Sequence, residues 1–73
     1  MQTSNAIGAH ASTDEIRFLR LPDVMLRVGL SRPTIYKSIA AGRFPKYIKV
    51  GSASVWNSRE VEAWMRAQLE GAR

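Results

Sequence analysis

The basic side chains of this chain are concentrated in one stretch that holds no acidic residue. From Val24 to Arg59 there are seven of them: Arg27, Arg32, Lys37, Arg43, Lys46, Lys49 and Arg59. The acidic residues lie before this stretch or after it: Asp14, Glu15, Asp23, Glu60, Glu62 and Glu70. Soluble surfaces usually intersperse the two signs, and the sequence pI of about 10.5 exceeds the guideline of about 9 for a nucleic-acid-binding domain. The stretch therefore predicts binding to a polyanion, with an ordinary solvated basic surface as the alternative.

Nothing in the sequence indicates catalysis. There is no cysteine, His10 is the only histidine, and no glycine-rich phosphate loop is present. Glu60 and Glu62 are two positions apart, so on a helix they do not face each other. We therefore expect a protein that is not an enzyme and that uses no metal and no cofactor.

The chain is long enough for one small domain. Residues 1–15 are small and polar, and we expect a disordered leader there, followed by a single domain over residues 16–73. Without disulfides, a domain of this size depends on close packing. No run approaches the roughly 20 apolar residues that cross a bilayer, and the first residues lack the basic and apolar regions of a signal peptide. We expect a cytoplasmic protein without a membrane partner.

Two short helices separated by a glycine-containing turn are predicted within this domain. Pro22 suits the first turn of the first helix, and Gly29 supplies the left-handed residue that ends it. Ser31 is a favourable N-cap for the second helix, which spans residues 31–41 and stops at Gly42. Such a pair is a helix-turn-helix, and in its DNA-binding form the second helix enters the major groove.

The faces of the second helix separate when successive residues are turned by about 100°. Ile35 and Ile39 define the inward side, with Leu30 packed beneath them. The opposite side carries Pro33, Lys37, Ala40 and Ala41. Thr34 and Tyr36 lie on the two flanks, and Arg32 lies at the N-terminal tip.

β-branched and aromatic residues around a Gly/Ser turn predict a hairpin over residues 44–56. In this hairpin we expect Ile48 and Val50 to face the core, and Tyr47 and Lys49 to face outward.

The remaining elements flank these. A third helix begins after Asn57, which caps it, and its buried stripe is Val61, Trp64 and Met65, extended by Leu69. Residues 16–21 form either a short strand or extended lead-in, or a hydrophobic tether onto the core. The predicted fold class is α+β, mostly α: a winged helix-turn-helix with three short helices and a small β-hairpin wing.

The exposed side chains of the second helix can contact DNA in different ways. Arg32 can bond a guanine at O6 and N7 or hold a phosphate. Thr34 can bond a base edge or phosphate, or else the helix start. Tyr36 can contact a phosphate or a thymine methyl, or else be a half-buried core aromatic, whereas Lys37 has no obvious structural role. With the hairpin, the predicted DNA-contacting set is Ser31, Arg32, Pro33, Thr34, Tyr36, Lys37, Arg43, Lys46, Lys49 and Ser52.

Several blocks of the sequence, taken in order, resemble the AlpA family of small phage and prophage regulators. They are RFLRLPDV at 17–24, GLSRPTIY at 29–36, GRFPK at 42–46 and EVEAW at 60–64. The family is related to excisionases and has a MerR-like winged-helix fold. The resemblance covers about residues 16–70 and implies a DNA-binding regulator of a prophage or integrative element, which activates transcription or assists excision.

The wing turn departs from the pattern of that family. Its members usually carry an arginine there, in a sequence like Gly-x-Arg followed by a small residue and Val. This chain reads GSASVW at 51–56, which is one residue shorter and has no basic side chain. The wing tip then has only Ser52, Ser54 and backbone amides for phosphate contact, so Lys46 and Lys49 must carry the charge of the wing.

We therefore expect a sequence-specific regulator of transcription that binds double-stranded DNA, with helix 31–41 in the major groove and hairpin 44–56 as the wing. A lone DNA-binding module buries only roughly 600–1,000 Å² of protein surface on DNA, so we expect a homo-oligomer or cooperative binding on DNA. A recombinase or RNA polymerase is a further expected partner. The alternative is an excisionase-like architectural factor that bends DNA and contacts a recombinase through its last helix. The target sequence, and the choice between activation, repression and excision, do not follow from the residues.

Overall fold

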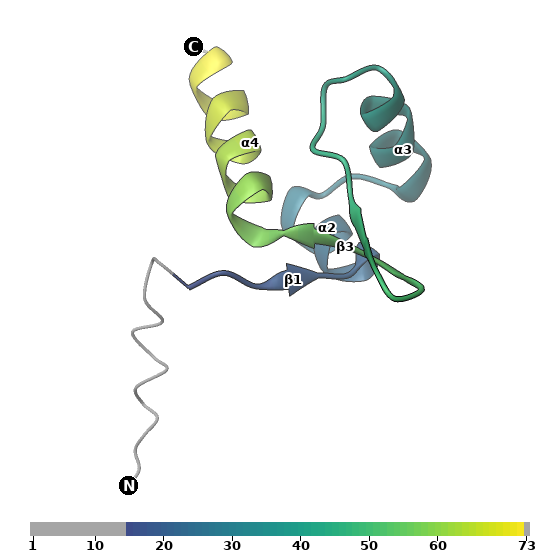
Figure 1. Cartoon of the computed structure of the whole chain (residues 1–73). Coiled ribbons are helices and arrows are strands. Elements are labelled where there is room, and N and C mark those ends of the chain that lie inside the picture. Colours follow the sequence, from purple (N-terminus) through teal and green to yellow (C-terminus); the bar gives the residue numbers. More distant parts are fainter. Residues whose placement is uncertain (1–14, 73) are drawn as a thin grey trace, which may run out of the picture.

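A computed structural model describes residues 15–72, which form three helices and a three-stranded antiparallel sheet (Figure 1). In chain order the elements are β1 (Phe18–Leu19), α2 (Leu21–Val28), α3 (Arg32–Ala40), β2 (Ile48–Val50), β3 (Ala53–Asn57) and α4 (Ser58–Gly71). The α+β, mostly helical, winged helix-turn-helix prediction is therefore confirmed. The leader expected over residues 1–15 lies, except for its last residue, outside the described residues.

The strands are arranged in the order β1-β3-β2, so the hairpin of β2 and β3 gains a third strand from the N-terminal side. Leu19 of β1 lies opposite Trp56 of β3. The pairing continues past the strand ends, because the Ser58 backbone N–H donates to the Arg17 carbonyl at 2.9 Å. The Arg17 N–H in turn donates to Ser58 Oγ at 2.9 Å. Of the alternatives for residues 16–21, the short strand is found at Phe18–Leu19. Leu19 also packs into the core, as the tether alternative expected, and Leu21 already belongs to α2.

Left-handed glycines end both helices of the helix-turn-helix, as predicted. Gly29 closes α2 with a φ of 70°, and Gly42 follows α3 with a φ of 75°. After α3, the Gly42 N–H donates to the Ile39 carbonyl at 3.0 Å and the Arg43 N–H donates to the Ser38 carbonyl at 2.8 Å. These two bonds make a Schellman motif, which satisfies carbonyls that the helix end leaves open. None of the helices within residues 15–72 is long and apolar enough to span a membrane.

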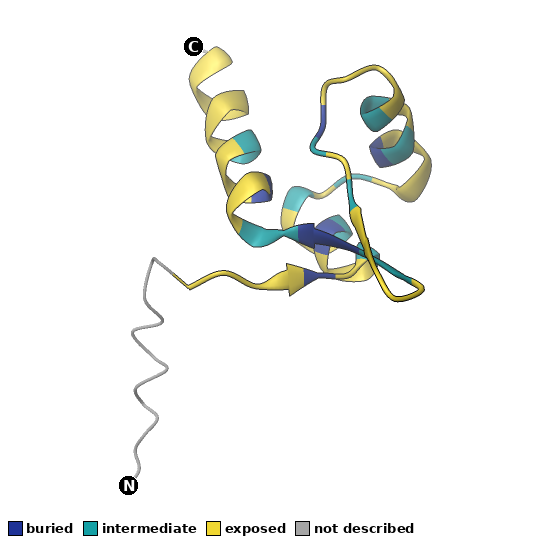
Figure 2. Cartoon of the chain, in the orientation of Figure 1, coloured by how far each residue is buried: buried dark blue, intermediate teal, exposed yellow. Residues whose placement is uncertain are grey.

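One cluster of buried side chains holds the elements together (Figure 2). The cluster takes one residue from each of β1, α2, α3, β3 and α4, and one from the segment between α3 and β2. In that order the residues are Leu19, Val24, Ile35, Trp56, Val61 and Phe44. The apolar residues predicted on the helices pack around it: Met25, Val28, Leu30, Ile39, Trp64 and Met65. The core therefore lies between the helices and the face of the sheet that carries Leu19 and Trp56, here called the inner face.

The prediction that Ile48 and Val50 face the core was wrong. Ile48 is 52% exposed and Val50 is 48% exposed. They lie opposite Val55 and Ala53 in the register of the hairpin, and the alternation of the pleat puts these residues on the face away from Trp56. On this outer face Val55 is 5% exposed while Ile48 and Val50 are half-exposed, so the face is apolar and only partly covered.

The inner face is occupied by aromatic rings instead. Tyr47, predicted to point outward, is partly buried against the core, and Trp56 is 1% exposed. Burying an indole and a tyrosine ring removes more apolar area from water than burying two aliphatic side chains. Packing of the rings therefore decides which face of the hairpin is inward.

The end of α4 also differs from the prediction. Leu69, predicted to extend the buried stripe, is 67% exposed, because the last turns of α4 run past the sheet (Figure 1). Leu69 lines a shallow groove with Val28 and Met65. The buried stripe of α4 is thus confined to its first two turns.

These assignments predict unequal losses of stability at two isoleucines. Ile35→Ala should lower the free energy of unfolding by about 2–5 kcal/mol, since Ile35 is fully buried. Ile48→Thr should cost less than about 1 kcal/mol, since the position is half-exposed and threonine suits a strand. Urea unfolding followed by tryptophan fluorescence measures both. Equal losses would contradict the observed faces of the hairpin.

Candidate nucleic-acid interface

The outward face of α3 is built from short or basic side chains. Ile35 is buried and Ile39 is half-buried, so they fasten the helix to the core. The residues on the opposite side and at the N-terminal tip are exposed: Arg32, Pro33, Thr34, Lys37 and Ala40. The predicted sorting of this helix into an anchored and a free side is confirmed.

The start of α3 differs from the prediction in one respect. Ser31 occupies the N-cap position with extended backbone angles, but its side chain makes no cap hydrogen bond. The Ser31 and Thr34 hydroxyl oxygens lie 3.0 Å apart and share a hydrogen bond instead. Thr34 therefore engages the helix start, which was the local alternative weighed for it, while both residues remain exposed.

A row of aromatic rings connects α3 to the hairpin; Tyr36, Tyr47 and Trp56 form it and are named here the aromatic row. The Tyr36 and Tyr47 ring centroids are 6.1 Å apart at an interplanar angle of 67°. The Tyr47 and Trp56 centroids are 5.6 Å apart at 67°. At the outer end, the Arg32 guanidinium carbon lies 5.9 Å from the centroid of the Tyr36 ring.

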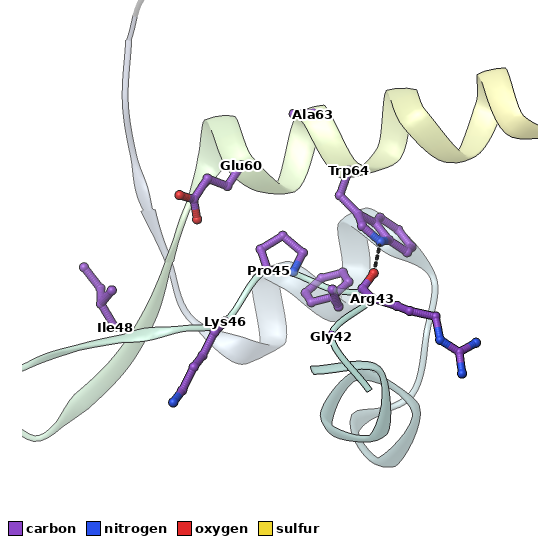
Figure 3. Close-up of a pocket in the computed structure, with 9 residues that line it drawn as sticks. Gly42, Arg43, Pro45, Lys46, Ile48, Glu60, Ala63 and Trp64 are labelled. Carbon is purple, nitrogen blue, oxygen red and sulfur yellow. Dashed lines mark hydrogen bonds between the residues drawn. The ribbon is translucent and has the colours of Figure 1, made fainter. Parts of the chain in front are cut away.

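The segment that leads from α3 to the hairpin is held by two indole groups. The Trp56 Nε1–H donates to the Pro45 carbonyl at 2.9 Å, and the Trp64 Nε1–H donates to the Arg43 carbonyl at 2.6 Å. Between these carbonyls, Phe44 is 5% exposed and packs edge-on against Trp64, with centroids 4.8 Å apart. We call these two hydrogen bonds the indole clamp; Figure 3 draws the one from Trp64. Sequence reasoning missed it, since it joins residues 11 and 21 positions apart.

The basic residues of the wing lie on different sides of it. Lys49 pairs with Ser54, and alternation along β3 puts Ser54 on the inner face with Trp56. Lys49 is thus on the side of the hairpin that faces α3, and Ser52 is exposed in the turn beyond it. Lys46 instead lines an open groove together with Glu60 of α4 (Figure 3).

The groove shown in Figure 3 separates the segment after α3 from the first turns of α4. Arg43 and Lys46 lie along one wall, and Glu60 and Trp64 along the other. The side chains of Arg43 and Lys46 extend away from α4 (Figure 3). Within residues 15–72, no group of three histidine, cysteine or acidic residues could hold a metal ion.

Alanine substitutions at the N-caps of α3 and α4 should change the free energy of unfolding by different amounts. Asn57 accepts a hydrogen bond from the Arg59 backbone N–H at 2.8 Å, so Asn57→Ala should lower the free energy of unfolding by about 1 kcal/mol. Ser31→Ala should change it by no more than about 0.5 kcal/mol, because the exposed Ser31 hydroxyl caps no backbone group. Chemical denaturation compares the two. A larger loss at Ser31 than at Asn57 would show that the cap of α3 is the stronger one.

Comparison with known proteins identifies a family and one phage relative. Residues 17–69 match the family described as "Prophage CP4-57 regulatory protein (AlpA)". The chain is 47% identical over 58 residues to an uncharacterized protein, ORF88, of Enterobacteria phage P4. That alignment covers 78% of this chain and 66% of the phage protein, so the chain spans about two thirds of the length of this relative. No solved structure matches the chain. Because the family match extends over most of the described residues, this chain belongs to the AlpA family of prophage regulatory proteins.

Proposed function

We propose that this protein is a sequence-specific DNA-binding regulator of a prophage or integrative element, with α3 in the major groove of double-stranded DNA. The observation that carries the proposal is the outward face of α3. It presents Arg32 and Lys37 on a helix whose other side is anchored by buried Ile35. Membership of a family of prophage regulators supports the regulatory role. A cytoplasmic location follows from this role, since the DNA of such an element lies there.

Arg32 and Lys37 are the proposed base-reading residues. Arg32 is the first residue of α3, and the N-terminal residues of a recognition helix contact base edges. A guanidinium can bond guanine O6 and N7 together, which discriminates against other bases by about 1–3 kcal/mol. Pro33 and the Ser31–Thr34 hydroxyl pair lie beside Arg32 and would meet the adjoining backbone.

The hairpin is the proposed wing, and its contacts go to phosphates. Lys49 is exposed on the side facing α3, and Ser52 is exposed at the tip. Arg43 and Lys46 extend from the segment between α3 and the hairpin (Figure 3). Contacts of this kind set affinity and register without reading sequence.

The two kinds of contact predict different losses of binding. Arg32→Ala or Lys37→Ala should reduce the preference for the selected site over random DNA by about 1–3 kcal/mol each, while the fold is retained. Lys49→Ala should weaken binding to all sequences alike and lower the slope of log K against log salt by about 1. Titration of labelled duplexes at several salt concentrations measures both quantities.

Arg66→Ala is the matched control, since Arg66 is an exposed cation on α4 that pairs with Glu62 at 3.2 Å. It removes the same charge from a surface outside the proposed interface and should leave the preference and the salt slope almost unchanged. Undiminished selectivity in both α3 variants would refute reading by α3. A Lys49→Ala slope equal to that of the wild type would remove Lys49 from the contacts.

We further propose that copies of this protein bind neighbouring sites cooperatively. A lone module buries roughly 600–1,000 Å² on DNA, and α3 offers two basic side chains for base reading. A probe with two sites should therefore give a sigmoidal isotherm, and a probe with one site should bind more weakly. Saturation of one isolated site by a monomer at nanomolar concentration would be inconsistent with cooperative binding.

A further inference from the structure

We infer that Tyr36 is a positioning residue: its ring holds the Arg32 guanidinium ready for DNA, and the rest of the aromatic row holds Tyr36. This inference rests on the proposed reading of DNA by α3. It replaces a direct contact between Tyr36 and DNA, which was one of the expectations for this residue, by an action through Arg32.

The outer end of the row is the contact between Arg32 and Tyr36. The two residues are four positions apart on α3, a spacing that brings side chains together on a helix surface. The guanidinium carbon lies 5.9 Å from the ring centroid, within the range at which the negative face of an aromatic ring attracts a cation. Arg32 is exposed, so in the absence of this contact its long side chain would sample many rotamers and lose that freedom on binding. The Tyr36 ring reduces this loss before DNA arrives.

The inner end of the row lies in the core. Tyr36 meets Tyr47 at 6.1 Å and 67°, and Tyr47 meets Trp56 at 5.6 Å and 67°. Both are edge-to-face arrangements, which aromatic pairs favour. Trp56 is 1% exposed and its indole N–H is bonded to the Pro45 carbonyl at 2.9 Å. Each ring is therefore fixed by the next, from a buried indole on β3 to the exposed tip of α3.

This arrangement gives the ring of Tyr36 two protein partners, the Arg32 guanidinium and the Tyr47 ring. The ring is half-buried, and its contacts with Arg32 and Tyr47 favour a positioning role over a direct contact with a base or thymine methyl. The row also joins α3 to the strand of the wing, so the angle of Arg32 relative to the wing depends on Tyr36 and Tyr47.

A double-mutant cycle tests the inference. Tyr36→Phe keeps the ring and should retain the ratio of affinities for the selected site and random DNA. Tyr36→Leu keeps bulk but has no aromatic face, and should lower that ratio by about two- to fivefold. In an Arg32→Ala background, Tyr36→Leu should cause no further loss, because two changes that act through one contact are not additive.

Two outcomes would overturn the inference. One is a loss in Tyr36→Phe as large as that in Tyr36→Leu, which would assign the hydroxyl a direct DNA contact. The other is a loss from Tyr36→Leu that adds fully to that of Arg32→Ala. Thermal unfolding of each variant checks the fold, and Tyr36→Met, whose flexible side chain fills irregular space, replaces Tyr36→Leu if that variant does not fold.

A measurement on the free protein separates this inference from the proposed function. The Arg32 side-chain protons should be shifted upfield in the NMR spectrum by the Tyr36 ring, and Tyr36→Leu should abolish the shift. Absence of the shift in the wild type overturns the inference whatever the DNA experiments give. If the shift is present but Arg32→Ala leaves selectivity intact, the proposed reading by α3 fails and the contact between Arg32 and Tyr36 stands as structural.

Discussion

The arrangement of the candidate interface depends on the indole clamp on the segment between α3 and the hairpin. A backbone carbonyl taken out of water needs a hydrogen-bond partner, and the part-buried Pro45 carbonyl receives one from Trp56. The hydrogen bond from Trp64 to the Arg43 carbonyl is exposed and holds the other end of the segment. Phe44, between them, enters the core at 5% exposure. Since the donors come from α4 and β3, one short segment ties α3, the wing and the last helix together. Without it, α3 and the wing would be joined by a loop of undetermined path.

The fold leaves the basic charge of the chain on its surface. Within residues 15–72 no polar or charged side chain is buried, and all seven basic residues from Val24 to Arg59 are exposed. On α4, Glu62 is paired with Arg66 of the same helix. The core thus consists of apolar and aromatic groups, and the cations of α3 and the wing are not needed to hold it together. This separation of tasks lets the interface change charge with little effect on stability.

Helix ends were predictable from the sequence because their signals are local. Gly29 and Gly42 adopt the left-handed conformation that ends a helix, and Asn57 caps α4 through its own side chain. The faces of the hairpin were not predictable in the same way. Both sets of alternating positions, Ile48 with Val50 and Tyr47 with Trp56, contain apolar residues, so alternation alone does not say which set is buried. The choice depends on aromatic packing against α3, which is a contact between distant parts of the chain.

The candidate site was likewise predictable only where its features are local in sequence. The free side of α3 followed from helical periodicity, and the structure places Arg32 and Lys37 there. The aromatic row and the indole clamp did not follow from it, because each joins elements far apart in sequence. A retrospective signal exists in the pair Phe44-Pro45 directly after a helix-ending glycine, with two tryptophans downstream as donors.

We propose that α3 and the wing form the surface that binds DNA. Amide chemical shifts of the labelled protein, recorded with and without a duplex chosen from a random pool, test it most directly. We expect the large changes on residues 31–37 of α3 and residues 49–52 of the wing, and small changes along residues 62–70 of α4. Changes concentrated on α4 or on the outer face of the sheet, with α3 unaffected, would contradict it.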